Sequence, residues 1–288
     1  MIDLISKIED YLNISIDYKK YLLIGNAFDK KALFLYKRKD NHPSILVRIP
    51  INIRAEKLCE NEYNNLLYLN TIKISNILAA QPLGKITYKG FNCYIQKTLF
   101  SNQMQTNLRT ILKKPRVKDF NIVVHFLSII YNKTKSTDNL TDKTFFNCWQ
   151  MGDCWIGNLG LYNNSLVLYD LEYAVRSGYP LYDLLHFGLH YFVALNNVGK
   201  LGKSIRDGNY TNKLDNRIFD SIEKMFIVDL INGGKFTILL KYAINTYTTK
   251  CNINKKDTKI LIKNYFEKFR GIGNLKNDWE KEVFKKIL

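Results

Sequence analysis

Three short segments near the start of the chain are rich in apolar and β-branched or aromatic residues, a composition typical of β-strands. These segments are Tyr21–Gly25, Lys31–Tyr36 and Ser44–Ile49. In the third, Ile45, Val47 and Ile49 share one face of the predicted strand. Arg48 therefore lies on the opposite face. Turn-rich sequence separates the segments, which predicts three successive antiparallel strands.

A helix is predicted after these strands, from about Arg54 to Asn70. Leu58, Glu62 and Leu66 follow one another at intervals of four residues and so lie on one stripe of this helix. A carboxylate on an apolar stripe needs a cation nearby, and Arg48 is the nearest candidate in sequence. The alternative, in which Glu62 sits at the helix edge and reaches solvent, stays open.

The rest of the chain predicts one more hairpin and then a series of helices. Segments Gly84–Lys89 and Asn92–Leu99 predict the hairpin, and helical spacing begins at Val117. Further helices are predicted at residues 181–197, 214–232, 235–249 and 256–270, with a shorter one at 276–287. The order of elements indicates an α+β fold of two lobes, an antiparallel-sheet lobe at residues 1–100 and a mainly helical lobe at residues 101–288.

The stretch from Gln150 to Ala174 places polar groups around another predicted hairpin. Its strands are Leu159–Tyr162 and Leu166–Tyr169, with a turn between them. Asp153 and Asn158 precede the hairpin and Asp170 follows it, so we expect the three side chains to converge at one end. Carboxylate and amide oxygens suit Mg²⁺ and its attached phosphates, and one of the acids would remain free to accept a hydroxyl proton.

The formal net charge of +17 at pH 7 favours anionic partners. The lysines are spread along the chain, however, and the sequence contains no zinc-finger spacing, RNP motif or basic helix. It therefore favours attraction to anionic ligands in general over nucleic-acid binding.

Cysteine usage and hydropathy predict a cytoplasmic protein. The five cysteines form no CxxC pair and are odd in number, which argues against a disulfide framework and against a structural zinc site. The first residues, MIDLISKIEDYL, mix acids and lysines with apolar residues, unlike a signal peptide. The longest apolar run, Val123–Tyr131, is too short to span a bilayer, which takes about 20 residues.

Two motifs around the second hairpin resemble those of a known superfamily. The segment that contains Asp153 and Asn158 is similar to H-G-D-x-x-x-x-N, and the segment that begins at Asp170 is similar to D-x-E. Both are motifs of the aminoglycoside phosphotransferase and choline kinase superfamily. The segment GYPLYDLLHF, which contains Asp183, resembles the G-x-P-x-x-D-L segment of that family. The resemblance covers residues 18–195 in order and implies a bilobal, protein-kinase-like fold.

This resemblance implies a nucleotide site with a Mg²⁺ ion and a catalytic base. Asp153 matches the base, and Asn158 and Asp170 match the Mg²⁺ ligands. Arg48 stands where the family has its phosphate-binding lysine, and Glu62 stands where the paired helix glutamate belongs.

Other positions implied by the resemblance would surround the nucleotide, which would be ATP or GTP. Gly25 begins the segment in the place of the phosphate-covering loop. Residues 95–98, IQKT, fall where a hinge would meet adenine, through Gln96 and Thr98. Asp183 would brace the catalytic loop through hydrogen bonds to the loop backbone.

Two departures from the family's pattern bear on activity. The histidine of H-G-D is Met151 in this chain, which removes a mainly architectural side chain. Arg48 replaces the lysine, and the planar guanidinium is longer than an ammonium and not interchangeable with it. Lys30 or Lys31 on a neighbouring strand is a candidate for the missing contact.

One histidine pair has a spacing that occurs in metal sites. His186 and His190 stand four residues apart on the helix predicted at 181–197. No glutamate that could serve as a general base lies between them, so we interpret them as a core or surface pair.

We expect an enzyme that uses ATP and Mg²⁺ to phosphorylate a hydroxyl of a small molecule or sugar. From Lys200 to Leu288 the chain has 19 Lys or Arg against 10 Asp or Glu, which favours a neutral or anionic acceptor, such as a surface-polysaccharide sugar. Two alternatives stay open. One is a nucleotide-binding pseudokinase scaffold, consistent with Arg48 and Met151, and the other is an aminoglycoside O-phosphotransferase with an acidic cleft.

Overall fold

The chain has an α+β fold that divides into two compact units. The computed structural model describes residues 1–25, 30–38, 43–99, 117–136, 146–162, 165–188 and 235–270. The first unit comprises Met1–Leu108 and Gly160–Ala174, and the second comprises Arg109–Leu159 and Val175–Leu288. A sheet with antiparallel strands dominates the first unit, while the second is mainly helical. The first unit also includes Gly160–Ala174, which the sequence prediction had assigned to the second lobe.

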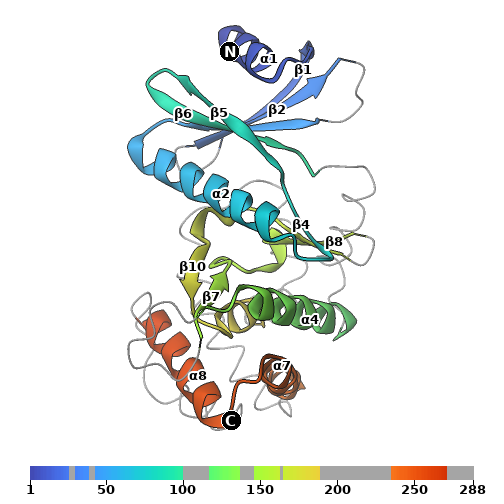
Figure 1. Ribbon diagram of the computed structural model, residues 1–288, viewed down its shortest axis with the longest axis vertical. Coiled ribbons are helices and arrows are strands. Elements are labelled where there is room, and N and C mark those ends of the chain that lie inside the picture. The colour runs from blue at the N-terminus through green and yellow to red at the C-terminus, as the bar shows by residue number, and fades with distance from the viewer. Residues whose placement is uncertain are drawn as a thin grey trace. The chain divides into compact units, whose positions relative to one another are not determined.

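The first unit is built on a five-stranded sheet with the order β1-β2-β3-β6-β5, in which all neighbours are antiparallel (Figure 1). Its strands are β1 (Ile16–Gly25), β2 (Lys30–Lys37), β3 (Ile45–Pro50), β5 (Pro82–Tyr88) and β6 (Phe91–Lys97). The predicted strands and the first predicted hairpin are thus confirmed, although β1 begins five residues before the predicted Tyr21. A register irregularity between Ile16 and Tyr21 interrupts the alternation there, which explains why the sequence pattern missed the start of the strand.

One face of this sheet carries the core of the unit, and helix α1 (Ile2–Leu12) packs on it. Ile45, Val47 and Ile49 point to this face, as predicted. The helix contributes Leu4, Ile5 and Ile8 to the same cluster. The sequence analysis predicted no helix here, although the apolar spacing of these residues is helical.

The opposite face of the sheet holds a second apolar cluster of Ala32, Phe34 and Leu46. Arg48 lies on this face, because it pairs directly with Ala32 across β2 and β3. The long helix α2 (Ile53–Ile72) follows β3 and confirms the helix predicted from Arg54 to Asn70. The side chain of Asn52 caps its start by accepting a hydrogen bond of 2.8 Å from the backbone N–H of Ala55.

A small three-stranded sheet with the order β4-β9-β8 holds the hairpin of the D-x-E motif in the first unit. Its strands are β4 (Ile77–Ala79), β8 (Leu159–Tyr162) and β9 (Ser165–Leu168), and the short 3₁₀ helix η2 (Leu171–Tyr173) follows. The predicted hairpin is present, with its second strand one residue earlier than predicted. The parallel pairing of β4 with β9 was not predicted, because a three-residue apolar strand has no distinctive pattern.

The second unit consists mainly of helices, with one short strand pair. Its elements are α4 (Val117–Thr134), β7 (Cys148–Gln150), the 3₁₀ helix η1 (Ile156–Asn158), β10 (Val175–Gly178), α7 (Lys235–Cys251) and α8 (Lys255–Arg270), and residues 182–188 are also helical. The helices predicted at 235–249 and 256–270 are confirmed, and the helix predicted at 181–197 is confirmed as far as residue 188. Those predicted at 214–232 and 276–287 lie outside the described residues.

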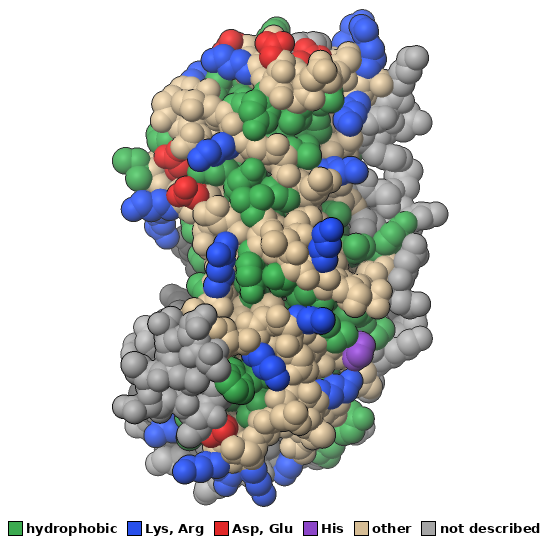
Figure 2. All heavy atoms as spheres, viewed as in Figure 1, with side chains coloured by type: hydrophobic (Ala, Val, Ile, Leu, Met, Phe, Trp, Pro, Cys, Tyr) green, Lys and Arg blue, Asp and Glu red, His purple; other side chains and the backbone are tan. Residues whose placement is uncertain are grey.

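The state of the cysteines agrees with the sequence analysis, which argued against a disulfide framework. All five cysteines are buried and free. Lys and Arg side chains are scattered over the face seen in Figure 2, with uncharged side chains between them. On this one face, the described Lys and Arg side chains therefore form no continuous patch. In the part of the chain that the structure describes, no helix combines the length and apolar character needed to cross a membrane.

Replacing Ile5 by Ala should test the contribution of α1 to the first unit. Ile5 is buried in the sheet core, so Ile5→Ala should lower the free energy of unfolding by about 2–4 kcal/mol. Ile2 on the same helix is 74% exposed, and Ile2→Ala should change it by less than about 0.5 kcal/mol. Urea unfolding followed by fluorescence measures both, and equal effects would contradict the packing of α1 on the sheet.

Candidate functional site

The first unit brings Arg48, Glu62 and Asp170 together. Arg48 Nη2 lies 2.9 Å from Glu62 Oε1 and 3.3 Å from Asp170 Oδ1. Glu62 is only 3% exposed, so its carboxylate depends on Arg48 for compensation. The alternative in which Glu62 reaches solvent is therefore wrong, and the predicted pairing of the strand arginine with the helix glutamate is confirmed.

A second cation, Lys30, completes this cluster from the start of β2. Its Nζ bonds the carboxylate of Glu172 and lies 3.5 Å from Asp170 Oδ1. Lys30 is two residues from Ala32, the partner of Arg48 across the strands, so both cations lie on the same face of the sheet. Lys30 is 1% exposed whereas Lys31 is exposed, so of the two predicted candidates Lys30 is the residue in the cluster.

The charges of this cluster nearly balance. Two cations and three carboxylates give a net charge of −1. Burial by itself lowers the pKa of Arg48. The carboxylates of Glu62 and Asp170 raise the pKa by more than burial lowers it, so the net shift is upward. Arg48 therefore stays charged, and the residual negative charge is compatible with a metal cation that carries anionic phosphates.

Two buried polar atoms of the cluster have no hydrogen-bond partner among the described residues. They are Arg48 Nε and Glu62 Oε2. A buried donor without an acceptor is costly, and native structures seldom tolerate one unless a ligand or water satisfies it. The N–H of Arg48 Nε is therefore a candidate donor to an anionic ligand.

Around Arg48 the sheet face is apolar and partly open. Residues that pair across the strands on this face are Leu22, Ile24, Ala32, Phe34, Leu46 and Gln96. Leu22 and Ile24 are about half exposed, while the others are buried. A planar apolar ring system could pack on such a face.

The other residues predicted for the nucleotide site lie at or near the ends of strands, and their described contacts are structural. Gly25 is the last residue of β1 and pairs with Lys31. Gln96 is buried opposite Leu46. Thr98 uses its hydroxyl to bond the carbonyl of Pro43 and its backbone N–H to bond Ser44, so its visible contacts hold the end of β6 in place.

In the second unit, Asp153 and Asn158 form a local pair. Asn158 Nδ2 donates to the backbone carbonyl of Asp153 at 3.1 Å and to its Oδ2 at 3.0 Å. An amide that donates through its nitrogen in this way directs its oxygen away from Asp153. The Asp153 side chain is 38% exposed, so a substrate could reach it.

Asp183 holds the backbone before Asp153, as the resemblance implied. Its two carboxylate oxygens accept hydrogen bonds from the backbone N–H groups of Met151 at 2.7 Å and Gly152 at 3.0 Å. Burial raises the pKa of Asp183 to about 6, against the opposing effect of these two hydrogen bonds. Met151 is itself buried and fills its position as an apolar side chain.

His186 is a neighbour of Asp153 that the sequence interpretation missed. Its Nε2 lies 3.4 Å from Asp153 Oδ1, and its ring stacks on that of Tyr182 with centroids 5.9 Å apart. His186 is thus a mostly buried side chain, while the interpretation of His186 and His190 as a core or surface pair is not tested, because His190 lies outside the described residues. The sequence did offer one indication that His186 lies near Asp153. His186 is three residues after Asp183, so both lie on the same side of a helix.

The residues present can hold a Mg²⁺ ion only in part. Within the described ranges, no group of three or more His, Cys, Asp or Glu side chains could hold a metal by itself. Mg²⁺ commonly takes one or two carboxylates and obtains its other oxygens from water and nucleotide phosphates. Asp170 in the first unit and Asn158 in the second each present an oxygen of a kind that Mg²⁺ accepts, so each residue by itself fits a metal that arrives with a nucleotide.

Comparisons with known proteins find similarity to solved structures alone. No protein-family model and no curated protein matches the chain. The chain is similar to a mutant of aminoglycoside 2′-phosphotransferase IIIa in complex with GDP, with 14% identity and a TM-score of 0.47 over 86% of this chain and 99% of that one. It is also similar to APH(2″)-IIIa in complex with GDP and kanamycin, with 12% identity and a TM-score of 0.46 over 88% of this chain and 100% of that one. At this level of similarity, the activity has to follow from the chain's own residues.

Replacing Lys30 should show how much a buried carboxylate destabilises the fold when it lacks its cation. Lys30→Met leaves Glu172 buried without its cation, so the free energy of unfolding should fall by about 3–5 kcal/mol. Lys31→Met, one residue away and exposed, should change it by less than about 0.5 kcal/mol. A double variant, Lys30→Met with Glu172→Leu, should recover most of the loss in the same denaturation experiment. Failure to recover would mean that Lys30 contributes by packing instead of by charge.

The raised pKa of Asp183 predicts that the stability difference between wild type and Asp183→Asn depends on pH. Because the folded-state pKa of about 6 exceeds the ordinary value of 3.8, the stabilisation from Asp183 is greatest below that ordinary value and is lost as the pH rises through about 6. Asp183→Asn has no such titration. Its stability deficit relative to wild type should therefore shrink by on the order of 2–3 kcal/mol between about pH 4 and pH 7.5. A deficit that stays constant in denaturant unfolding at both pH values would contradict the assignment.

Proposed function

We propose that the chain is a phosphotransferase that uses ATP or GTP with Mg²⁺ to phosphorylate a hydroxyl of a small molecule or sugar. The observation that carries the proposal is the environment of Arg48. This side chain bonds both the helix carboxylate of Glu62 and the motif carboxylate of Asp170, and its buried Nε has no partner among the described residues. A phosphate oxygen would satisfy that donor.

Each residue of the two clusters has a distinct function in this proposal. Arg48 binds nucleotide phosphate, and Glu62 fixes the guanidinium through its 2.9 Å contact. Lys30, which is buried, neutralises Glu172 and the near oxygen of Asp170 instead of touching the nucleotide. Arginine can take this position because its planar fork bonds a carboxylate and a phosphate oxygen at once.

Asp153 accepts the proton of the acceptor hydroxyl, which leaves the oxygen able to attack the terminal phosphate. Asn158 holds Oδ2 of this carboxylate, and His186 lies beside Oδ1, so both oxygens have a fixed neighbour. Asp183 keeps the preceding backbone in place. Such a site works mainly by positioning its reactants.

Asp170 and Asn158 are the proposed Mg²⁺ ligands. The bound metal would neutralise phosphate charge during the transfer. The αL backbone of Asp170, with φ 53° and ψ 63°, sets the direction of its carboxylate. Asn158 directs its amide oxygen away from Asp153, so the same side chain can hold the base through its nitrogen and a metal through its oxygen.

The apolar face of the sheet is the proposed site for the nucleotide base. Leu22 and Ile24 are partly exposed there, beside the buried Ala32 and on the same face as Arg48. A purine ring gains hydrophobic stabilisation on such a surface. Gly25 at the end of β1, with Gln96 and Thr98 near the end of β6, completes the proposed nucleotide site.

The excess of basic residues after Lys200 supports a neutral or anionic acceptor, because a polycation would be repelled. Competition among acceptors tests this part of the proposal. Efficient phosphorylation of kanamycin-like polyamines, with neutral and acidic sugars ignored, would overturn it and favour the aminoglycoside alternative.

A nucleotide-binding protein without transfer is the second candidate. It is favoured by Arg48 and Met151, which stand where the resemblance implies a lysine and a histidine. Thermal stabilisation by ATP or GTP that does not depend on Mg²⁺, together with no transfer to any acceptor in a broad panel, would favour this candidate.

Asp153→Asn and Asp170→Asn should separate base catalysis from metal binding. Asp153→Asn should lower phosphate transfer by about 10²–10⁴-fold and leave Mg²⁺-dependent nucleotide binding intact. Asp170→Asn should remove the Mg²⁺ dependence of thermal stabilisation, and asparagine tolerates the αL backbone there. The exposed Asp10 provides a control, since Asp10→Asn should change neither readout. Equal transfer by wild type and Asp153→Asn would refute the proposed base.

A further inference from the structure

The turn that carries Asp170 has an unusual backbone. Asp170 adopts the left-handed conformation, with φ 53° and ψ 63°, which is uncommon outside glycine, although Asp and Asn adopt it more readily than other side chains. It precedes the short helix η2, and its side chain makes no capping hydrogen bond there. Its carboxylate instead lies beside Arg48 and Lys30. The surrounding structure must therefore hold this conformation.

Two asparagines of α2 bind the backbone just after Asp170. Asn61 Nδ2 donates to the carbonyl of Glu172 at 2.7 Å and to that of Ala174 at 3.0 Å. Asn65 Nδ2 donates to the same Ala174 carbonyl at 3.0 Å. Ala174 is fully buried, so these carbonyls have no water to replace the amides.

The two amides also position each other. Asn65 Nδ2 donates to the backbone carbonyl of Asn61 at 2.9 Å and approaches its Oδ1 at 3.4 Å. Asn65 is itself buried, where a polar side chain is costly unless it is fully bonded. The backbone N–H of Ala174 donates to Leu171, which closes the turn from within.

We propose that Asn61 and Asn65 act as positioning residues that fix residues 170–174 and so orient Asp170 for its metal. This inference rests on the proposed function, in which Asp170 binds Mg²⁺. The described contacts of the Asp170 carboxylate, from Arg48 at 3.3 Å and Lys30 at 3.5 Å, are both long and both made to Oδ1, so they leave this residue some freedom to turn. The asparagines remove that freedom by holding the backbone two and four residues further on.

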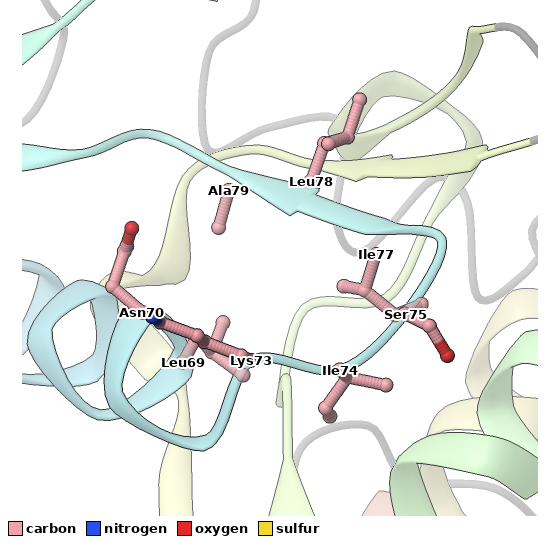
Figure 3. Close-up of a pocket in the computed structure, with 8 residues that line it drawn as sticks. All are labelled: Leu69, Asn70, Lys73, Ile74, Ser75, Ile77, Leu78 and Ala79. Carbon is pink, nitrogen blue, oxygen red and sulfur yellow. The ribbon is translucent and has the colours of Figure 1, made fainter.

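The same helix supplies a matched control in Asn70. Asn70 Nδ2 donates to the carbonyl four residues earlier at 2.8 Å and to the carbonyl of Ala80 at 3.0 Å, the arrangement that Asn65 makes with Ala174. Figure 3 shows Asn70 among the residues that line a cavity of about 370 Å³ at the end of α2 and β4. Replacing Asn70 therefore removes an equivalent pair of hydrogen bonds without touching the turn after Asp170.

Hydrogen exchange of the ligand-free protein tests the contact itself. Asn65→Leu should speed exchange of the amides in residues 171–175 by at least about tenfold, because the buried Ala174 carbonyl loses one of its two donors and Asn61 loses the amide that positions it. Asn70→Leu should leave these amides unchanged. Unchanged exchange in Asn65→Leu would overturn the inference, whatever the activity of the protein. If Asn65→Leu does not fold, the half-buried Asn61→Ala provides the same test.

A Mg²⁺ titration of nucleotide-induced thermal stabilisation, with ATP and GTP in parallel, tests the consequence for Asp170. Asn65→Leu should need about tenfold more Mg²⁺ for half of the effect, and Asn70→Leu should match wild type. Faster exchange with an unchanged Mg²⁺ midpoint would overturn the inference, because the contact would then serve stability alone. Wild type that gains no stability from either nucleotide at any Mg²⁺ concentration would instead refute the proposed function, and the exchange result would still report on the contact.

Discussion

The fold of the first unit depends on ion pairs that neutralise its buried carboxylates. Glu62 and Glu172 are removed from water, and each relies on one cation from an adjacent strand of the sheet, Arg48 or Lys30. Asp170 lies near both cations. Since neither acid could stay charged alone, the ion pairs tie β2, β3, α2 and the turn after β9 into one arrangement. The meeting of Arg48, Glu62 and Asp170 at the candidate site follows from that constraint.

The parts of the site that the sequence predicted are those with a local signal. Arg48 and Glu62 are separated by 14 residues, and strand and helix periodicity placed them on faces that could meet. Asp183 was assigned to backbone bonding by its motif, and both bonds are present. Apolar, β-rich composition between turn-rich segments likewise predicted the strands of the main sheet, apart from the start of β1, where the register is irregular.

The parts that the sequence could not predict depend on contacts between distant segments. Lys30 and Glu172 are 142 residues apart, and nothing in the local pattern distinguishes Lys30 from Lys31. The pairing of β4 with β9 joins a predicted strand to a three-residue apolar run that could equally have been loop. This pairing also explains why the hairpin before Asp170 belongs to the first unit. The predicted lobes were continuous in sequence, so they could not assign a later segment to the first lobe.

Helix α2 contacts three different segments of the first unit along its length, and these contacts together restrict its movement. Glu62 bonds the strand arginine, Asn61 and Asn65 bond the turn after Asp170, and Asn70 bonds the carbonyl before β5. A rigid helix cannot slide or rotate to lengthen one of these contacts without disturbing the rest. Displacement of α2 would therefore be an all-or-none event, in which the guanidinium loses its carboxylate and the turn loses its anchor together.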